Sequence, residues 1–261
     1  MREMTKKRVR EEDLLIYFHA NNLYICCTLM CYMVHIMTIE YHGIKPWGRS
    51  FDEYVRMFSL TPADLKRKIL GCGDGPASFN VELTERGGNI ISVDPIYYFS
   101  ADRIMQKISE TYDDIIDQTR KNRDQFVWQE IGSVEELGRV RMSAMEKFLK
   151  DFPKGMMQKR YIPGELPSLP FGNKEFDLAL CSHFLFLYTD NLSLEFHLRA
   201  LEELCRVSNE VRIFPLLDVN ASRSTYVDTV IDFLREEKRD VEEVKVAYEF
   251  QRGGNTMLNI C

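Results

Sequence analysis

Three glycines within five residues are the first feature of the sequence that could do chemistry. Gly71, Gly73 and Gly75 alternate with Cys72 and Asp74 directly after a short apolar stretch. Glycine has no Cβ, so a loop of this kind lets backbone N–H groups approach a ligand closely. Taken alone, the pattern indicates a nucleotide or nucleoside site without saying which.

A carboxylate and a proline narrow the choice of ligand. Asp94 stands nineteen residues after Gly75, at the end of the next predicted strand, from which a carboxylate can accept hydrogen bonds from both ribose hydroxyls. A dinucleotide fingerprint requires a third small residue at the sixth position of the loop, where this chain has Pro76. The pattern therefore favours an adenosyl compound without a pyrophosphate over a nicotinamide dinucleotide.

Three spaced motifs resemble those of class I S-adenosylmethionine-dependent methyltransferases. ILGCGDG at 69–75 resembles the first motif and VDP at 93–95 the second. GELPSLPF at 164–171, with the EFDL that follows it, is similar to the third. The resemblance covers roughly residues 48–260 and extends to a bacterial group of uncharacterised methyltransferases.

The resemblance implies which residues hold the cofactor, S-adenosylmethionine. Asp94 would bind the ribose, Glu165 would bond the adenine amino group, and Leu166 would offer the adjacent backbone N–H. The predicted cofactor-binding residues are Gly71, Cys72, Gly73, Gly75, Asp94, Pro95, Glu165, Leu166 and Ser182.

One position departs from the family's pattern. The family usually has an acidic residue two places before the first loop glycine, where it anchors the cofactor's amino group or the loop, and this chain has Ile69 there. Asp74, or a residue of the predicted helix at 50–58, would have to compensate.

The resemblance implies transfer of a methyl group to an unidentified small-molecule or protein acceptor. This in-line displacement needs an aligned donor and acceptor and, for a poor nucleophile, removal of a proton. His183, just past the strand predicted at 176–181, is the candidate general base or substrate contact. A purely structural histidine is the alternative.

Two other functions compete with an enzyme of this class. A non-catalytic S-adenosylmethionine-binding regulatory module is favoured by the missing acid at Ile69. A nucleotide-dependent oxidoreductase is disfavoured by Pro76 and by the acid at Glu165.

The periodicity of the chain predicts the elements that position these residues. Apolar strands are predicted at 66–70, 89–93, 176–181 and 210–217, with helices at 50–58, 76–86, 194–207 and 224–239 and a closing strand pair at 244–250 and 256–260. We expect an α/β fold: a doubly wound, mostly parallel seven-stranded sheet with helices on both faces.

More than sixty residues separate the second strand from the next candidate near residue 160, far beyond an ordinary crossover. Helical periodicity at 100–124 and 133–152 predicts a helical insertion over 100–155, either stabilising the scaffold or covering the substrate pocket.

Residues 1–37 are predicted to be an extra apolar segment before a methyltransferase domain at 38–261. The segment is either an additional helix or sequence upstream of the natural start, with Met37 opening the protein. A membrane span is disfavoured, because the basic stretch before residue 14 would retain the N-terminus in the cytoplasm and send the domain outside.

Composition excludes several classes of function. A net charge of −6 argues against a broad nucleic-acid-binding surface. The seven cysteines include no CxxC pair, so they predict reduced thiols in a cytoplasmic protein and no metal site.

Overall fold

Seven strands form one sheet in the structure, a computed structural model that describes residues 45–261. In spatial order they are β3, β2, β1, β4, β5, β7 and β6. Their bounds are β1 (Lys68–Cys72), β2 (Asn89–Val93), β3 (Tyr161–Ile162), β4 (Phe176–Ser182), β5 (Ser208–Phe214), β6 (Val241–Lys245) and β7 (Thr256–Ile260). The predictions for residues 1–37, and the domain boundary at 38, lie outside the described residues.

The sheet is mixed, with one reversed strand. β1 pairs in parallel with β2 and β4, and the pairs β2–β3 and β4–β5 are also parallel. β7 runs antiparallel between β5 and β6. The seven-stranded α/β sheet and its closing strand pair are confirmed, but the sheet is mixed, because β7 pairs antiparallel with both of its neighbours, and β6 begins three residues earlier than expected.

Successive strands are added first on one side of β1 and then on the other. From β1 it goes outward through β2 to β3, and then returns to the other side of β1 to form β4 and β5. In open parallel sheets, ligands bind where the strand order reverses, beside the carboxyl ends of the strands. This topology places the residues after β1, β2 and β4 along one edge.

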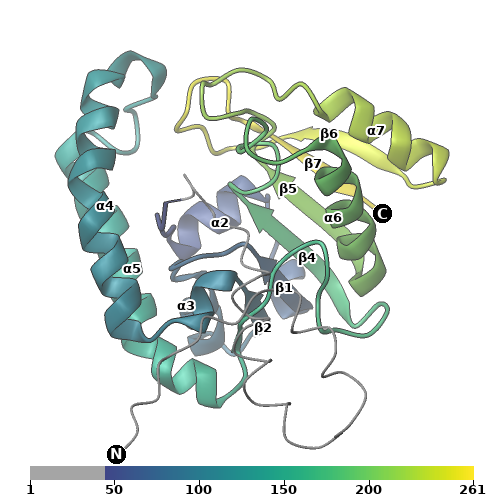
Figure 1. Cartoon of the computed structure of the whole chain (residues 1–261), viewed down its shortest axis with the longest axis horizontal. Helices are drawn as coiled ribbons and strands as arrows, with labels where there is room; N and C mark the ends of the chain where they lie inside the picture. The colour runs from purple at the N-terminus through teal and green to yellow at the C-terminus, as the bar shows by residue number, and fades with distance from the viewer. Residues whose placement is uncertain (1–44) are drawn as a thin grey trace, which may run out of the picture. The chain divides into compact units, whose positions relative to one another are not determined.

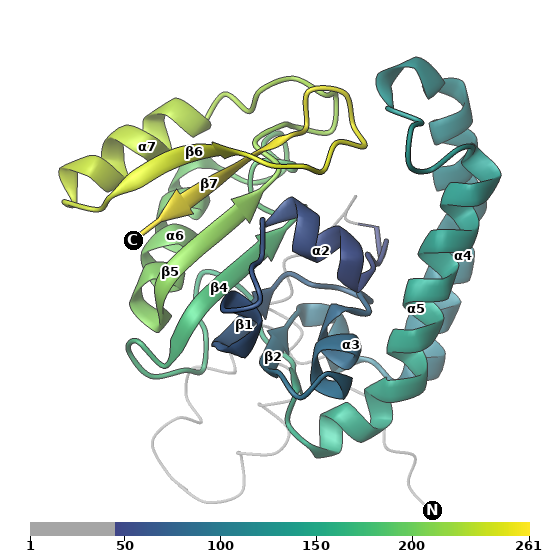
Figure 2. The same ribbon diagram turned by 180° about the vertical axis from the view of Figure 1, so that it is seen from behind.

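Helices cover both faces of the sheet. α2 (Phe51–Met57) and α3 (Phe79–Glu85) lie on one face, whereas α6 (Leu194–Val207) and α7 (Val227–Glu236) lie on the other (Figures 1 and 2). Side chains alternate between the two faces of a strand, so Ile69, Leu178 and Leu180 all point into the core under α2 and α3. Short 3-10 helices occupy Asp64–Lys66, Pro95–Tyr98 and Arg123–Gln125.

The start of α2 follows from its sequence. The Ser50 hydroxyl accepts a hydrogen bond from the Glu53 N–H, and the Glu53 carboxylate accepts one from the Ser50 N–H, which together form a capping box. This confirms the predicted helix start. Tyr54 and Met57 are buried against the sheet, so α2 is fixed at both its beginning and its apolar side.

Two long helices separate β2 from β3 in the chain. α4 (Ala101–Lys121) and α5 (Val134–Met157) lie side by side at one side of the sheet (Figure 2). Both predicted helices are present, and α5 continues past residue 152 to include Pro153. They share a buried cluster with the first residues after β2 and with β3, formed by Tyr97, Ile104, Ile108, Met145, Phe148, Phe152 and Tyr161.

The loop between α4 and α5 reaches the loop between β6 and β7. The Val127 N–H donates to the carbonyl oxygen of Phe250 at 2.7 Å, and the Arg252 N–H donates to that of Gln125 at 2.8 Å. The rings of Phe126 and Phe250 stack with centroids 4.9 Å apart. We call this union of 124–128 with 249–252 the tip contact.

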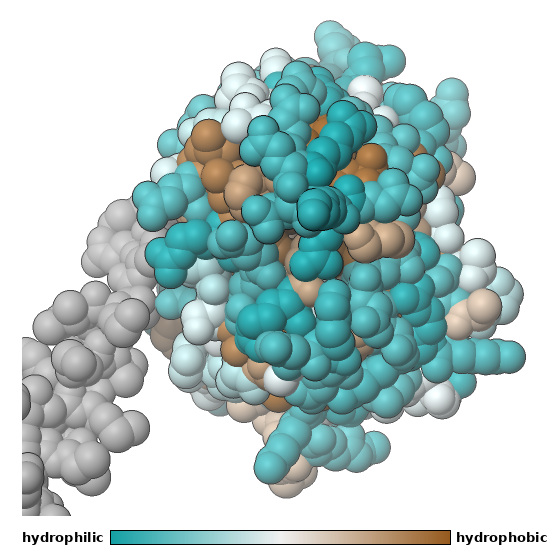
Figure 3. Space-filling view, turned by 90° about the vertical axis from the view of Figure 1, so that its right-hand side faces the viewer, coloured by the Kyte–Doolittle hydropathy of each residue, from teal (hydrophilic) through white to brown (hydrophobic). Residues whose placement is uncertain are grey.

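The surface on the side of α6 and α7 is mainly hydrophilic, with small separate hydrophobic areas (Figure 3). Within residues 45–261, no helix is long and apolar enough to cross a bilayer.

Candidate functional site

The glycine loop starts two residues later than the sequence predicts. β1 continues through Gly71 and Cys72, because both are paired with β2 and β4, and the loop proper begins at Gly73. Gly73 and Gly75 have φ values of 69° and 53°, a region that favours glycine. A Cβ on Gly75 would meet no atom of the described residues within 4 Å, so the loop has open space there.

Asp94 holds the loop from the neighbouring strand. One carboxylate oxygen accepts the Gly75 N–H at 2.8 Å, and the other accepts the Ile96 N–H at 2.8 Å, capping the short helix that begins at Pro95. Burial, together with the smaller effect of the nearby negative charge of Glu165, raises the pKa of Asp94 to about 6. The structure thus brings the second predicted acid close to the first.

Asp74 provides a loop-anchoring acid, which the apolar Ile69 cannot. Ile69 is fully buried in the core, whereas the Asp74 carboxylate lies where a Cβ on Gly71 would stand. It accepts hydrogen bonds from the hydroxyls of Tyr54 at 2.8 Å and Ser92 at 2.6 Å. Asp74 therefore ties the loop to α2 and β2, the loop-anchoring role that the sequence left to it or to the first helix.

The remaining predicted cofactor residues divide into side chains and backbone. The Cys72 thiol is buried, and burial raises its pKa well above the ordinary value, so this residue can offer only its backbone. Leu166 is buried and Glu165 is half-buried, in the loop after β3. Ser182 ends β4, on the other side of β1.

The two tyrosines that follow Asp94, Tyr97 and Tyr98, lie in different environments. Tyr97 is buried in the cluster under α4 and α5, and its hydroxyl donates to the Gly75 carbonyl oxygen at 2.8 Å. Tyr98 is 66% exposed. Tyr97 therefore holds the glycine loop from the buried side.

His183 stands at the turn after β4, as predicted. Its φ is 51°, its N–H donates to the Phe214 carbonyl oxygen, and its Nδ1 is 2.9 Å from the Ser182 hydroxyl. Burial lowers its pKa well below the ordinary value, and the positive charges of Arg49 and Arg141 lower it further. The imidazole is therefore neutral near pH 7, the form that can accept a proton.

His197 has a structural role. Its Nε2 accepts the Phe186 N–H at 3.1 Å, while Nδ1 lies 2.9 Å from the Ser193 carbonyl oxygen. Both ring nitrogens are thereby occupied by the backbone.

A buried ionic cluster joins α2 to α5. Arg141 is 0% exposed and donates to both carboxylate oxygens of Glu53 at 2.5 Å. Glu53 also accepts the Tyr248 hydroxyl at 2.9 Å. Burial would raise the pKa of Glu53, but Arg141 and Arg49 lower it to about 2, so the carboxylate stays ionised.

The sequence contains a signal for this cluster that the motif search did not use. Arg141 falls within the apolar stripe of its helix, between Leu137 and Phe148 at helical spacing. A lone arginine in such a stripe needs a buried partner. The partner itself, Glu53, is 88 residues away and is not apparent from local pattern.

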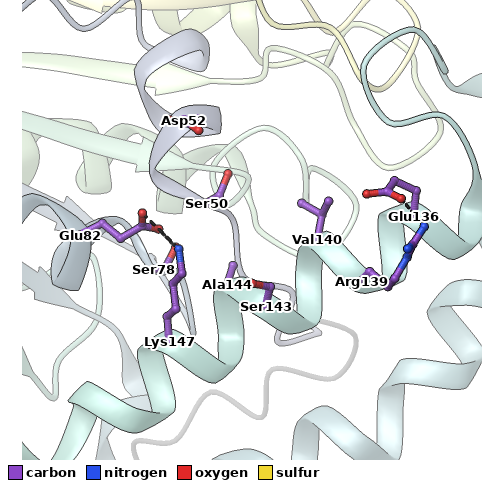
Figure 4. A pocket seen from close by; sticks show the side chains of 10 residues that line it. All are labelled: Ser50, Asp52, Ser78, Glu82, Glu136, Arg139, Val140, Ser143, Ala144 and Lys147. Atoms are coloured by element: carbon purple, nitrogen blue, oxygen red, sulfur yellow. Dashed lines mark hydrogen bonds and ion pairs between the residues drawn. The ribbon is translucent and has the colours of Figure 1, made fainter.

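A surface hollow of about 420 Å³ lies between α5 and the starts of α2 and α3 (Figure 4). Most of the residues that line it are polar, and Lys147 pairs with Glu82 across it at 3.3 Å. The predicted cofactor residues do not line it. Among residues 45–261, no group of histidine, cysteine or acidic side chains is placed to hold a metal ion.

The fold defines an α/β protein in which the glycine loop after β1 and the carboxylate after β2 lie together at one edge of the sheet. No family model matches the chain. It is 37% identical over 214 residues to the uncharacterised protein MJ0045 of the archaeon Methanocaldococcus jannaschii, covering 82% of this chain and 94% of that protein. The chain belongs to the same family as that protein. Because this relative is archaeal, the resemblance to a bacterial group is not confirmed.

Solved structures similar to this chain include methyltransferases. A SAM-dependent methyltransferase from Aquifex aeolicus is 14% identical, with a TM-score of 0.39 over 80% of this chain and 87% of that one. A TehB-like SAM-dependent methyltransferase from Corynebacterium glutamicum is 14% identical, with a TM-score of 0.44 over 90% and 97%. Magnesium protoporphyrin IX methyltransferase from Synechocystis, with bound SAM, is 9% identical, with a TM-score of 0.43 over 95% and 89%. At these values, only the chain's own residues can carry a functional conclusion.

Proposed function

We propose that the chain is an S-adenosylmethionine-dependent methyltransferase that acts in the cytoplasm on a small-molecule or protein acceptor. The observation that carries the proposal is the hydrogen bond between the Gly75 N–H and the Asp94 carboxylate. It holds the carboxylate that we propose binds the ribose directly beside a loop that has open space at Gly75. The neighbouring charge of Glu165 supports a second polar contact, to the adenine.

The residues present fit the cofactor. Each oxygen of Asp94 accepts one backbone N–H and retains a lone pair that can accept a ribose hydroxyl. Glu165 and the backbone N–H of Leu166 would hold the adenine, and the loop from Gly73 to Gly75 would face the amino-acid end. When bound, S-adenosylmethionine supplies an electrophilic methyl group on a sulfonium.

His183 is proposed to serve the acceptor. It follows β4, beside the strand that carries the glycine loop, and its ring packs edge-on against Phe214 with centroids 5.4 Å apart. A neutral imidazole at this place can take the proton that the acceptor atom loses as its bond to the methyl carbon forms. Ser182 fixes the ring through the contact at Nδ1.

Binding of the cofactor is tested by titration calorimetry with S-adenosylhomocysteine and, separately, with NAD. We expect micromolar affinity for the former and no heat with the latter. Equal binding of both compounds would contradict the cofactor assignment.

The Asp94→Ala variant tests the ribose contact. We expect its affinity for S-adenosylhomocysteine to fall at least ~10-fold, because hydrogen bonds to a charged group are worth about 1.5–3 kcal/mol. The matched control is Asp102→Ala on the exposed side of α4, which should bind as the parent chain does. Unchanged affinity in Asp94→Ala would show that the ribose lies elsewhere.

Turnover separates the enzyme from a non-catalytic binding module. We expect a cell extract supplied with methyl-labelled S-adenosylmethionine to yield a labelled product with the parent chain and much less with His183→Ala. Tight cofactor binding without any transferred label would instead favour the regulatory module.

A further inference from the structure

Among residues 45–261, the cluster between α2 and α5 has hydrogen-bond donors without acceptors. Arg141 spends one nitrogen, Nη1, on Glu53, while its Nε and Nη2 are buried and find no acceptor within residues 45–261. The Nε of Arg49 is in the same condition. Buried N–H groups are nearly always paired in folded proteins, so three unpaired guanidinium nitrogens in one place call for an explanation.

The charges of the cluster are also unbalanced. Within the part of the chain that the structure describes, two guanidinium groups face one carboxylate, that of Glu53, and His183 beside them is neutral. Burial lowers the pKa of Arg49, and the positive charge of Arg141 lowers it further. The cluster therefore has a net charge of +1, and a single additional anion would neutralise it.

The geometry places this uncompensated positive charge on the side of the sheet where we propose that the methyl acceptor binds. Glu53 and Tyr54 are adjacent on α2, but Tyr54 points to Asp74 under the glycine loop, whereas Glu53 points to Arg141 and Tyr248. The Tyr248 and His183 rings both pack against the ring of Phe214 at the end of β5. The proposed ribose and adenine contacts follow β2 and β3, on the other side of β1.

We propose that Arg49 and Arg141 bind the carboxylate of a small monoanionic methyl acceptor and hold it beside His183. A carboxylate supplies the one negative charge that the cluster lacks, whereas a phosphate dianion would overshoot it. Its two oxygens match the fork of donors on a guanidinium group. Arg141, fully buried, forms the base of this subsite, and Arg49, which is half-buried, lies at its mouth. This inference rests on the proposed methyltransferase function and names its substrate class.

The test measures binding to the full chain saturated with S-adenosylhomocysteine. The probes are acetate and benzoate, each compared with its amide, acetamide or benzamide, by thermal shift and calorimetry. We expect at least one carboxylate to bind ~10-fold or more tightly than its amide, because an amide carries no charge for the arginine pair. Identical behaviour of acids and amides would overturn the inference.

Two variants connect that preference to the pair. Arg49→Met, at the half-buried position, and the double variant Glu53→Gln/Arg141→Met, which removes both members of the buried ion pair, should each lose the preference for the acid. Arg139→Met is the matched control, since its side chain is 74% exposed on the same helix, and it should keep the preference. If both arginine variants fold and still prefer the acid, the inference is wrong.

The same variants separate the acceptor's carboxylate from the cofactor's own. 5′-Methylthioadenosine lacks the amino-acid end of S-adenosylhomocysteine, so it cannot contact the pair. If the arginine variants lose S-adenosylhomocysteine and keep 5′-methylthioadenosine, the pair binds the cofactor and the acceptor inference fails. If the parent chain binds neither compound, the proposed function itself fails.

Discussion

Asp74 is a charged side chain held where charge is costly. It is 8% exposed, and burial raises its pKa from 3.8 to about 6, despite the hydroxyls of Ser92 and Tyr54 that donate to it. The folded chain therefore binds this proton more tightly than the unfolded chain does. The contribution of Asp74 to stability is greatest below about pH 4 and is lost as the pH rises to about 6.

Asp74→Asn removes that dependence. We expect the variant to be more stable than the parent chain at pH 7, by about 1–3 kcal/mol, and about equally stable at pH 4. An asparagine oxygen still accepts one hydroxyl, so the loop keeps part of its anchor. Chemical denaturation at both pH values measures the difference, with exposed Asp113→Asn as the control. A loss of stability at pH 7 would mean that the anchor outweighs the burial cost.

Among single residues, those within a local motif were easier to predict than those whose role depends on a contact with a distant residue. Asp94 was predicted from its spacing after the glycine loop and Glu165 from the resemblance to the methyltransferase motifs, and the structure places their charges close together. Arg141 was not found, because its meaning depends on Glu53, whose contact with it closes a loop of 88 residues. A one-dimensional pattern contains no information on which distant charge will meet it.

At the scale of elements, the predictions succeeded where the determining interactions are local. α6 occupies the predicted residues 194–207, and its start is fixed by the Ser193 hydroxyl. β1 ends two residues later than predicted, because its last two residues are in the sheet only through pairing with β2 and β4. The apolar run ends at Leu70, whereas the pairing with β2 and β4 continues to Cys72.

The capping box of α2 should be worth a measurable amount of stability. Ser50→Ala removes the side-chain acceptor for the Glu53 N–H and a donor to the Glu53 carboxylate. We expect a loss of about 1–2 kcal/mol in the free energy of unfolding, at the upper end of values for a helix cap, because this cap also restrains a buried ion pair. Ser143→Ala, exposed within α5, is the matched control and should change stability little. Equal effects of the two changes would contradict the role of the cap.

At the scale of the whole molecule, the tip contact offers a direct reporter of the α4–α5 pair. The chain has two tryptophans, and Trp128 packs edge-on against Phe250 with centroids 5.4 Å apart. Phe250→Ala should expose Trp128 and shift its emission to longer wavelength, with faster amide exchange in residues 124–128. The control, Phe99→Ala at a ring that is 43% exposed, should leave the spectrum unchanged.

The same variant addresses the role predicted for the 100–155 segment. If the pair only stabilises the scaffold, Phe250→Ala will lower the melting temperature and leave the KM for the acceptor unaltered. If the pair covers the substrate pocket, we expect the KM to rise several-fold with little change in melting temperature. We favour the second outcome, because the tip contact joins two loops, while the buried cluster at β3 already fixes the helices.

The tip contact also sets the order in which the protein can be completed during synthesis. The Val127 N–H donates to the carbonyl oxygen of Phe250, and the Gln125 carbonyl oxygen accepts from the N–H of Arg252. Phe250 and Arg252 become available only after more than a hundred further residues have left the ribosome. Tyr248, the hydroxyl partner of Glu53, arrives in the same late segment. The glycine loop and Asp94 can therefore form early in the nascent chain, whereas the arginine cluster gains its last partner only after Tyr248 has been synthesised.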